Sequence, residues 1–180
     1  FKFCEAAQKN GMDVFRVFDA LNAVERTRPV IDAVREHAGY AEGAICYTAD
    51  LADPATPARL YAATQARGLW VETLVNNAGY GVPGRYLSAP WKTHADFLQV
   101  LLTSVAELTY LYLPAMEAAG RGRILNVASL AGLVPASAGH TLYGATKLWL
   151  VRFSESLAQE VGKHGVHVTA LCPGFTYTEF

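Results

Sequence analysis

Three polar residues in the second half of the chain could together move a proton to or from a carbonyl oxygen. Tyr143 and Lys147 stand four positions apart, a spacing that places both side chains on one face of a helix. An ammonium beside a phenol favours the phenolate form, which makes Tyr143 a candidate proton donor and acceptor. Ser129 supplies a further hydroxyl that can hold the same substrate oxygen. These groups predict general acid–base chemistry on a carbonyl or an alcohol.

The composition sets limits on the kinds of partner. The chain has 180 residues, of which 52% are hydrophobic and 17% charged, enough for one domain with a core. A net charge of -1 gives no basic field for nucleic acid or anionic lipid, and no apolar run predicts a transmembrane helix. Three widely spaced cysteines suit a reducing compartment, so a cytoplasmic location is expected, and scattered histidines predict no metal site. The sequence lacks an initial Met and stops abruptly, so both ends are interpreted as cuts in a longer reading frame.

The residues that could do chemistry must be positioned by alternating strands and helices. The predicted strands are 14–18, 44–47, 73–75, 123–127 and 166–171, and the predicted helices include 57–66, 95–118 and 143–161. Another helix is expected to start near Thr27 or to kink at Pro29. This alternation predicts an α/β fold, a three-layer, doubly wound parallel sheet of about five strands. Its order is expected to be Rossmann-like, or flavodoxin-like as 2-1-3-4-5.

Ligands in such sheets bind beyond the carboxyl ends of the strands. The segments that follow the predicted strands there are Asp19, Asp50, Asn76 to Gly79, Ser129 and Pro173-Gly174. We therefore expect these segments to meet at one edge of the sheet.

From about residue 50 onward, five motifs occur in a distinctive order. They are Asp50-Leu51-Ala52-Asp53, Asn76-Asn77-Ala78-Gly79, Ser129, Tyr143-x-x-x-Lys147, and Pro173-Gly174 followed by Thr178. In order and spacing this part of the chain resembles the short-chain dehydrogenase/reductase family. The resemblance implies hydride transfer between a carbonyl or alcohol substrate and NAD or NADP.

The same resemblance implies a role for each matching residue. Tyr143 would exchange a proton with the substrate oxygen, Ser129 would hydrogen-bond that oxygen, and Lys147 would favour the phenolate and hold the nicotinamide ribose. The residues implied for cofactor binding are Asp50, Asn76, Ala78, Gly79, Tyr143, Lys147, Pro173, Gly174 and Thr178.

Two departures from the family pattern predict weak or absent cofactor binding and impaired activity. The family's Thr-Gly-x-x-x-Gly-x-Gly loop, whose glycines let the backbone approach a pyrophosphate, has no counterpart before Asp50. The spacing Gly79-x-Gly81-x-x-Gly84 leads into Arg85-Tyr86-Leu87-Ser88-Ala89-Pro90 rather than a helix pattern, so it is not expected to bind phosphate. The second departure is Leu101, which stands where the family usually has an Asn that anchors a relay water, and Leu cannot hydrogen-bond. Thr103 and Ser104 stay open as substitutes for that Asn.

Residues 1–49 resemble another family. The segments 10–22 and 43–48 are similar to the carboxyltransferase barrel of biotin-dependent enzymes such as pyruvate carboxylase and oxaloacetate decarboxylase. This resemblance implies a β-α-β piece of a (β/α)8 barrel without that family's metal ligands. The sequence thus predicts a single α/β domain, 1–180, built from a barrel-like piece, 1–49, and a dehydrogenase-like piece, 50–180. Natural recombination, an engineered chimera and an assembly artefact stay open as its origin.

Three functions stay open at this point. The chain is an impaired reductase acting on a small carbonyl or alcohol, an α/β scaffold without catalysis, or an interaction module. Self-association is expected through the apolar faces of 95–118 and 143–161, or through an exposed edge strand.

Overall fold

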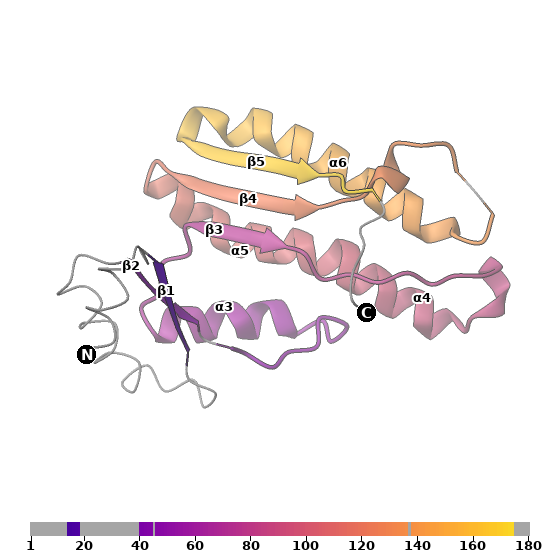
Figure 1. Cartoon of the computed structure of the whole chain (residues 1–180), viewed down its shortest axis with the longest axis horizontal. Coiled ribbons are helices and arrows are strands. Elements are labelled where there is room, and N and C mark those ends of the chain that lie inside the picture. The colour runs from indigo at the N-terminus through magenta and orange to yellow at the C-terminus, as the bar shows by residue number, and fades with distance from the viewer. Residues whose placement is uncertain (1–13, 19–39, 45, 137, 175–180) are drawn as a thin grey trace. The chain divides into compact units, whose positions relative to one another are not determined.

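The computed structural model describes residues 14–18, 40–44, 46–136 and 138–174. The chain divides into two compact units, residues 1–48 and 49–180. In the first unit, β1 (Val14–Phe18) and β2 (Tyr40–Ala44) form a parallel pair, with Val14 opposite Tyr40 and Phe18 opposite Ala44 (Figure 1). Asp19 and the helix expected around Pro29 lie outside the described residues.

The predicted second strand, 44–47, is wrong in position. The strand spans 40–44 instead, and Cys46 and Tyr47 follow it in irregular structure. The expectation rested on a short apolar run, whereas the observed strand includes Glu42 and Gly43, two residue types with low strand preference. Pairing along the whole length of β1 therefore outweighs local preference here.

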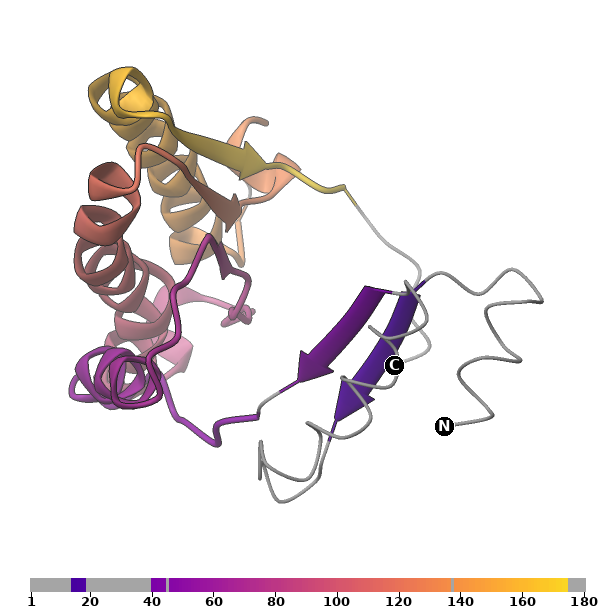
Figure 2. The ribbon, with the colours of Figure 1, turned by 90° about the vertical axis from the view of Figure 1, so that its left-hand side faces the viewer.

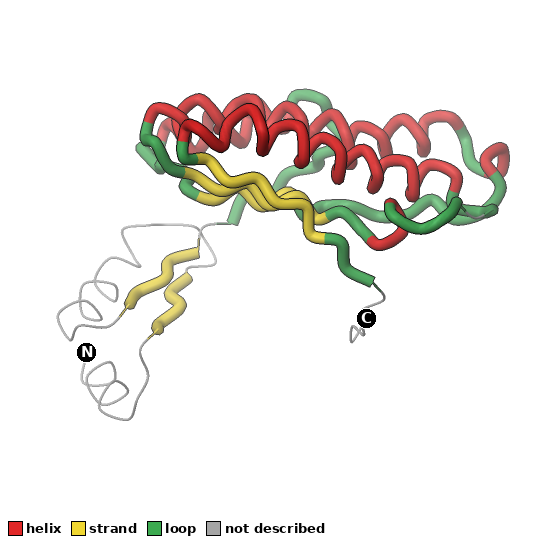
Figure 3. Tube along the Cα trace, turned by 90° about the horizontal axis from the view of Figure 1, so that it is seen from above, coloured by secondary structure: helices red, strands yellow, loops and turns green. Residues whose placement is uncertain are grey.

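The second unit contains a parallel sheet in the order β3 (Thr73–Asn76), β4 (Gly122–Val127) and β5 (Val166–Leu171). The main helices are α3 (Thr56–Ala66), α4 (Trp91–Leu98), α5 (Ser104–Ala118) and α6 (Thr141–Val161). Short helical turns are η1 (Tyr86–Ser88), η3 (Leu130–Gly132) and η4 (Gly162–His164). The helices α5 and α6 cover one face of this sheet (Figures 2 and 3).

The predicted α/β class with parallel strands is confirmed by these two sheets. The neighbours β1–β2, β3–β4 and β4–β5 agree with the order 2-1-3-4-5. That order also requires β1 to lie beside β3, which stays a prediction.

The helix expected over 95–118 begins earlier, at Trp91, directly after the extended residue Pro90. Between α4 and α5 the helix has a π-helical segment, η2 (Gln99–Thr103). By length and composition this 28-residue helix could cross a membrane, but a buried helix of a globular core passes the same test. Its residues Phe97, Leu101 and Met116 are buried in the core.

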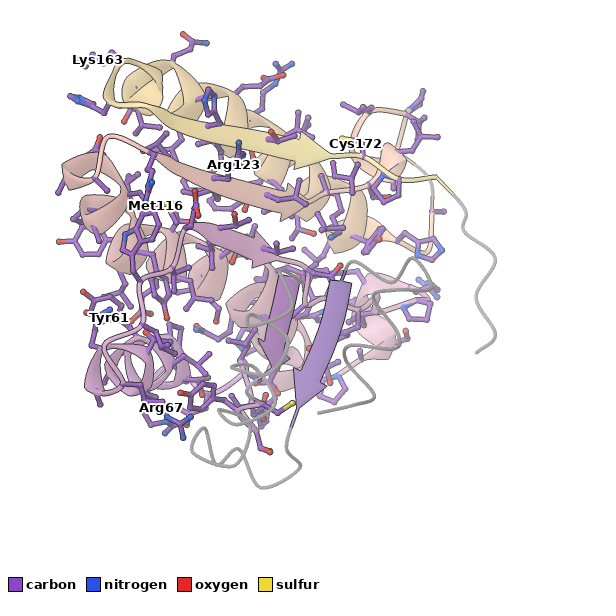
Figure 4. The ribbon with its side chains drawn as sticks, turned by 60° about the vertical axis from the view of Figure 1, so that its left-hand side comes forward. Tyr61, Arg67, Met116, Arg123, Lys163 and Cys172 are labelled. Carbon is purple, nitrogen blue, oxygen red and sulfur yellow. The ribbon has the colours of Figure 1, made fainter. Side chains whose placement is uncertain are left out.

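Close packing joins α5 to β4. Met116 is fully buried beside Ile124 and Val166, and it points from α5 toward the sheet (Figure 4). A Cβ atom on Gly122 would lie 2.6 Å from the Met116 side chain, so only glycine permits this approach. Burial of a side chain of this size stabilises the fold by about 1.5–3 kcal/mol.

Candidate active site

The first two turns of α6 carry the predicted pair Tyr143 and Lys147. Helical spacing brings the Lys147 ammonium to 5.7 Å from the centroid of the Tyr143 ring. The predicted common face of the two residues is therefore confirmed.

Lys147 is almost fully buried and fixed at the end of β4. Only 5% of the residue is exposed, and its Nζ donates a hydrogen bond of 2.7 Å to the main-chain oxygen of Val127. Burial lowers the pKa of the Lys147 ammonium from its ordinary value. An ammonium has three N–H donors, so donors remain that can bind hydroxyl groups of a ligand.

Ser129 follows β4 and begins the η3 turn. Its Oγ accepts a hydrogen bond of 3.1 Å from the Ala131 main-chain N–H. Because the hydroxyl acts there as an acceptor, its own O–H remains to donate to a substrate oxygen.

Glycine allows the η3 turn to lie directly against α6. A Cβ atom on Gly132 would lie 2.6 Å from the main-chain nitrogen of Leu148 and 2.7 Å from the carbonyl carbon of Lys147. On the other side, the Leu130 N–H donates to the Pro173 oxygen at 2.9 Å, which joins the segments that follow β4 and β5. These two contacts hold Ser129 in position relative to α6.

One cavity of about 370 Å³ brings the predicted residues together. The predicted residues in its wall are Gly79, Ser129, Tyr143, Lys147, Pro173 and Gly174. Its wall also includes Asn77, which belongs to the motif Asn76 to Gly79 but was not itself predicted to bind the cofactor. The other residues in the wall, for which the sequence predicted no role, are Tyr80, Gly81, Val127, Ala128 and His140. The only signal for His140 is its place at the N-terminus of α6, where its carbonyl oxygen accepts from the Tyr143 N–H at 3.1 Å.

Two of the residues predicted to bind the cofactor, Asp50 and Ala78, are described by the structure but are not part of that wall. Asp50 is exposed and its Oδ1 accepts from the Ala52 N–H at 2.9 Å. Burial raises the pKa of the Tyr80 hydroxyl, and the charges of Asp96 and Asp50 raise it further. Asp50 is thus within electrostatic range of a residue in the cavity wall. Ala78 is exposed outside the lining, and Thr178 lies outside the described residues.

Asn76 is also absent from the cavity wall and belongs to a buried hydrogen-bond network instead. Its Nδ2 donates to Asn126 Oδ1 at 2.8 Å and, more weakly, to Thr109 Oγ1 at 3.4 Å. Asn126 in turn donates to Ser154 Oγ at 2.8 Å, and Ser154 donates to the Leu150 oxygen at 2.7 Å. This network connects β3 and β4 to the helix that carries Tyr143 and Lys147.

The segment from Gly79 to Gly84 differs in structure from a glycine-rich turn that opens an α-helix. Gly84 has a φ of 107°, and its N–H is already used by the Gly139 oxygen at 2.9 Å. The segment leads into the short turn η1 rather than into an α-helix. The buried residue Leu101 lies close to Gly79, 3.6 Å from the position of a Cβ atom there.

Comparisons with known proteins bear on this geometry. The family model described as short chain dehydrogenase matches residues 1–180. The chain belongs to the short-chain dehydrogenase family. The match includes residues 1–49, and the comparisons give the resemblance to a carboxyltransferase barrel no support.

Individual members of the short-chain dehydrogenase family agree in sequence and fold. The ketoacyl reductase HetN of a Nostoc species is 34% identical over 105 residues, 58% of this chain and 36% of that protein. A short-chain dehydrogenase from Streptomyces avermitilis is 30% identical with a TM-score of 0.69, covering 97% of this chain and 62% of that one. A Beutenbergia cavernae protein, described as an NAD(P)-dependent gluconate 5-dehydrogenase and crystallised with NADP at low occupancy, is 31% identical with a TM-score of 0.67. It covers 84% of this chain and 59% of its own.

These structural relatives establish a Rossmann-like α/β fold. The chain spans between about a third and two thirds of the length of the relatives named here.

Proposed function

We propose that this chain provides the proton-transfer half of an NAD(P)-dependent oxidoreductase that interconverts a small carbonyl compound and an alcohol. The observation that carries the proposal is the common cavity of Ser129, Tyr143 and Lys147, whose wall also includes Pro173 and Gly174. Family membership and relatives described as ketoacyl reductase and NAD(P)-dependent dehydrogenase support this reaction class.

The cavity suits the nicotinamide-ribose part of the cofactor. Lys147 Nζ lies 3.8 Å from the position of a Cβ atom on Gly79, so the main chain at Gly79 lies next to the ammonium. The remaining Lys147 donors would hold ribose hydroxyls, and Gly79, Pro173 and Gly174 would form the adjoining wall. The bound cofactor would supply or accept the hydride.

The chain's own residues would handle the substrate oxygen. The Ser129 O–H would donate to that oxygen and orient it toward Tyr143. Tyr143 would give a proton to the oxygen during carbonyl reduction and take it back during alcohol oxidation. The Lys147 ammonium, 5.7 Å from the Tyr143 ring, would stabilise the phenolate formed in the first case.

We further propose that cofactor affinity is low. The sequence lacks the Gly-rich pyrophosphate loop, and its one Gly-x-Gly-x-x-Gly segment enters a short turn without an α-helix. A second candidate function, a chimeric or recombined α/β scaffold with no activity, is favoured by the same missing loop. A cytoplasmic location and a homodimer through α5 and α6 or the β5 edge also stay proposals.

Titration calorimetry on the full chain tests the proposed function. NADPH and NADH should each bind saturably but more weakly than micromolar, and Lys147→Met should abolish that binding. The control Lys163→Met, at an exposed position in η4, should leave it unchanged. Absence of saturable binding at millimolar cofactor would favour the scaffold, whereas micromolar affinity would contradict the expected weakness.

A further inference from the structure

A second, very small cavity lies between η1, α4 and the start of α6. Its volume is about 10 Å³, and its polar walls come from Tyr86, His94, Thr141 and Tyr143. This volume corresponds to about one water molecule. Tyr143 lines both this cavity and the larger one with Ser129 and Lys147, so the residue is shared by the two.

His94 presents an unpartnered polar atom at this place. The residue is only 5% exposed, and its Nε2 is 2.8 Å from the main-chain oxygen of Tyr86. A carbonyl oxygen can only accept, so Nε2 carries the proton and Nδ1 of the neutral ring is an acceptor. Nδ1 is buried, and no hydrogen-bond partner for it exists among the described residues.

The imidazole ring is fixed by its neighbours. It stacks on the Tyr86 ring with centroids 4.8 Å apart and an angle of 20°, and the Trp91 ring lies at 6.5 Å. A ring held in this way does not turn its Nδ1 toward solvent without losing both the stack and the hydrogen bond to Tyr86. A buried acceptor in a fixed ring requires a donor close by.

We infer that this cavity is a binding site for one ordered water. The water donates a hydrogen bond to His94 Nδ1 and also contacts the Tyr143 hydroxyl. His94 is then a positioning residue that acts on Tyr143 through the water, whereas Lys147 belongs to the larger cavity. The role of this water in catalysis rests on the proposed function. The presence of the water and its two contacts does not depend on that function.

A crystal structure of the full chain that resolves ordered waters tests the site directly. We expect a water within about 3.2 Å of His94 Nδ1 that also contacts Tyr143. His94→Phe should lose this water, and His94→Gln, whose amide can again donate on one side and accept on the other, should retain it. A protein donor on Nδ1, or a water that contacts Thr141 and not Tyr143, would overturn the inference.

Nitrogen NMR of ¹⁵N-histidine-labelled protein provides a second readout in solution. The Nδ1 resonance of His94 should have the chemical shift of an unprotonated nitrogen and should move in Tyr143→Phe. It should stay unchanged in Tyr110→Phe, which alters a largely exposed tyrosine on α5. An Nδ1 chemical shift that is the same in wild type and in Tyr143→Phe would refute the inferred water contact between His94 and Tyr143. Because neither measurement uses a cofactor, the water site can stand or fall independently of the oxidoreductase.

Discussion

The ammonium of Lys147 donates to the main-chain oxygen of Val127 at 2.7 Å, and this bond joins α6 to the carboxyl end of β4. The same lysine is therefore both a structural link and the candidate group that assists Tyr143. Burial lowers the pKa of its ammonium, so the stability that Lys147 contributes depends on pH.

Lys147→Met should change the pH dependence of stability in a defined direction. Burial lowers the pKa of the folded-state Lys147 below 10.5, so between the lowered pKa and 10.5 the unfolded chain binds more protons. The free energy of unfolding contributed by this residue therefore rises with pH across that window. Urea unfolding at a series of pH values should show wild type gaining stability relative to Lys147→Met as the pH increases. Exposed Lys163→Met should show no such trend, and a wild-type advantage that shrinks with rising pH would contradict the assignment.

Tyr143→Phe should remove turnover without unfolding the protein. The variant keeps the ring beside Lys147 but lacks the transferable proton, a loss that costs about 10²- to 10⁴-fold in rate. Spectrophotometric assay of NAD(P)H oxidation with a panel of small ketones measures the effect, and unfolding stability should stay within about 0.5 kcal/mol. Tyr110→Phe serves as the matched control, and equal activity of the two variants would exclude Tyr143 from the chemistry.

Two neighbouring asparagines should respond differently to replacement by alanine. Asn76→Ala leaves the Asn126 Oδ1 without its buried donor and should destabilise the fold by about 1–3 kcal/mol. Asn77 is exposed, so Asn77→Ala should change stability by less than about 0.5 kcal/mol. Chemical unfolding of both variants checks the difference, and similar costs would show that the network contributes little.

Gly132→Ala should disturb the active site from outside the cavity. The new methyl group would overlap with the main chain at Leu148 and Lys147, and such overpacking costs about 1–3 kcal/mol. The turn must then move away from α6, so cofactor binding should weaken as well. Gly162→Ala meets no atom within 4 Å, and this control should leave both stability and binding near wild type.

Self-association should involve exposed apolar residues on α5 and α6. Tyr110 is 76% exposed and Leu148 is 41% exposed, and Trp149 stacks on Phe153 with ring centroids 4.8 Å apart. Gel filtration across a concentration series should show a dimer that Tyr110→Lys weakens. Leu87→Lys, at an 88% exposed position on η1, should leave the dimer intact. A concentration-independent monomer would rule this surface out.

The convergence of Ser129 and Lys147 could be predicted from the sequence because both depend on regular elements. Strand β4 ends at Val127, so Ser129 had to lie at the carboxyl edge of the sheet, and helical spacing alone placed Lys147 beside Tyr143. These relationships follow from local periodicity and the direction of parallel strands.

What could not be predicted depends on packing between distant segments. No local pattern distinguishes Asn76, which hydrogen-bonds within the core, from Asn77, which lines the cavity. The position of β2 followed its pairing with β1 rather than its composition. The hydrogen-bond partner of His94 is Tyr86, eight positions earlier in the short helical turn η1. Spacing rules within one helix or strand do not predict a contact between two separate elements.

The π-helical segment η2 determines the direction in which the following side chains point around the axis of the continuous helix Trp91–Ala118. A helical residue advances by about 100°, so a π turn shifts every following side chain around the axis relative to an uninterrupted α-helix. His94 and Phe97 precede this shift, and Leu108 and Met116 follow it, yet all four are buried. Deleting one residue between Gln99 and Thr103 would therefore rotate one half of the helix away from its neighbours. The short segment therefore lets one continuous helix pack on the sheet through α5 and against Tyr143 through the cluster of Phe97, Val100 and Leu101.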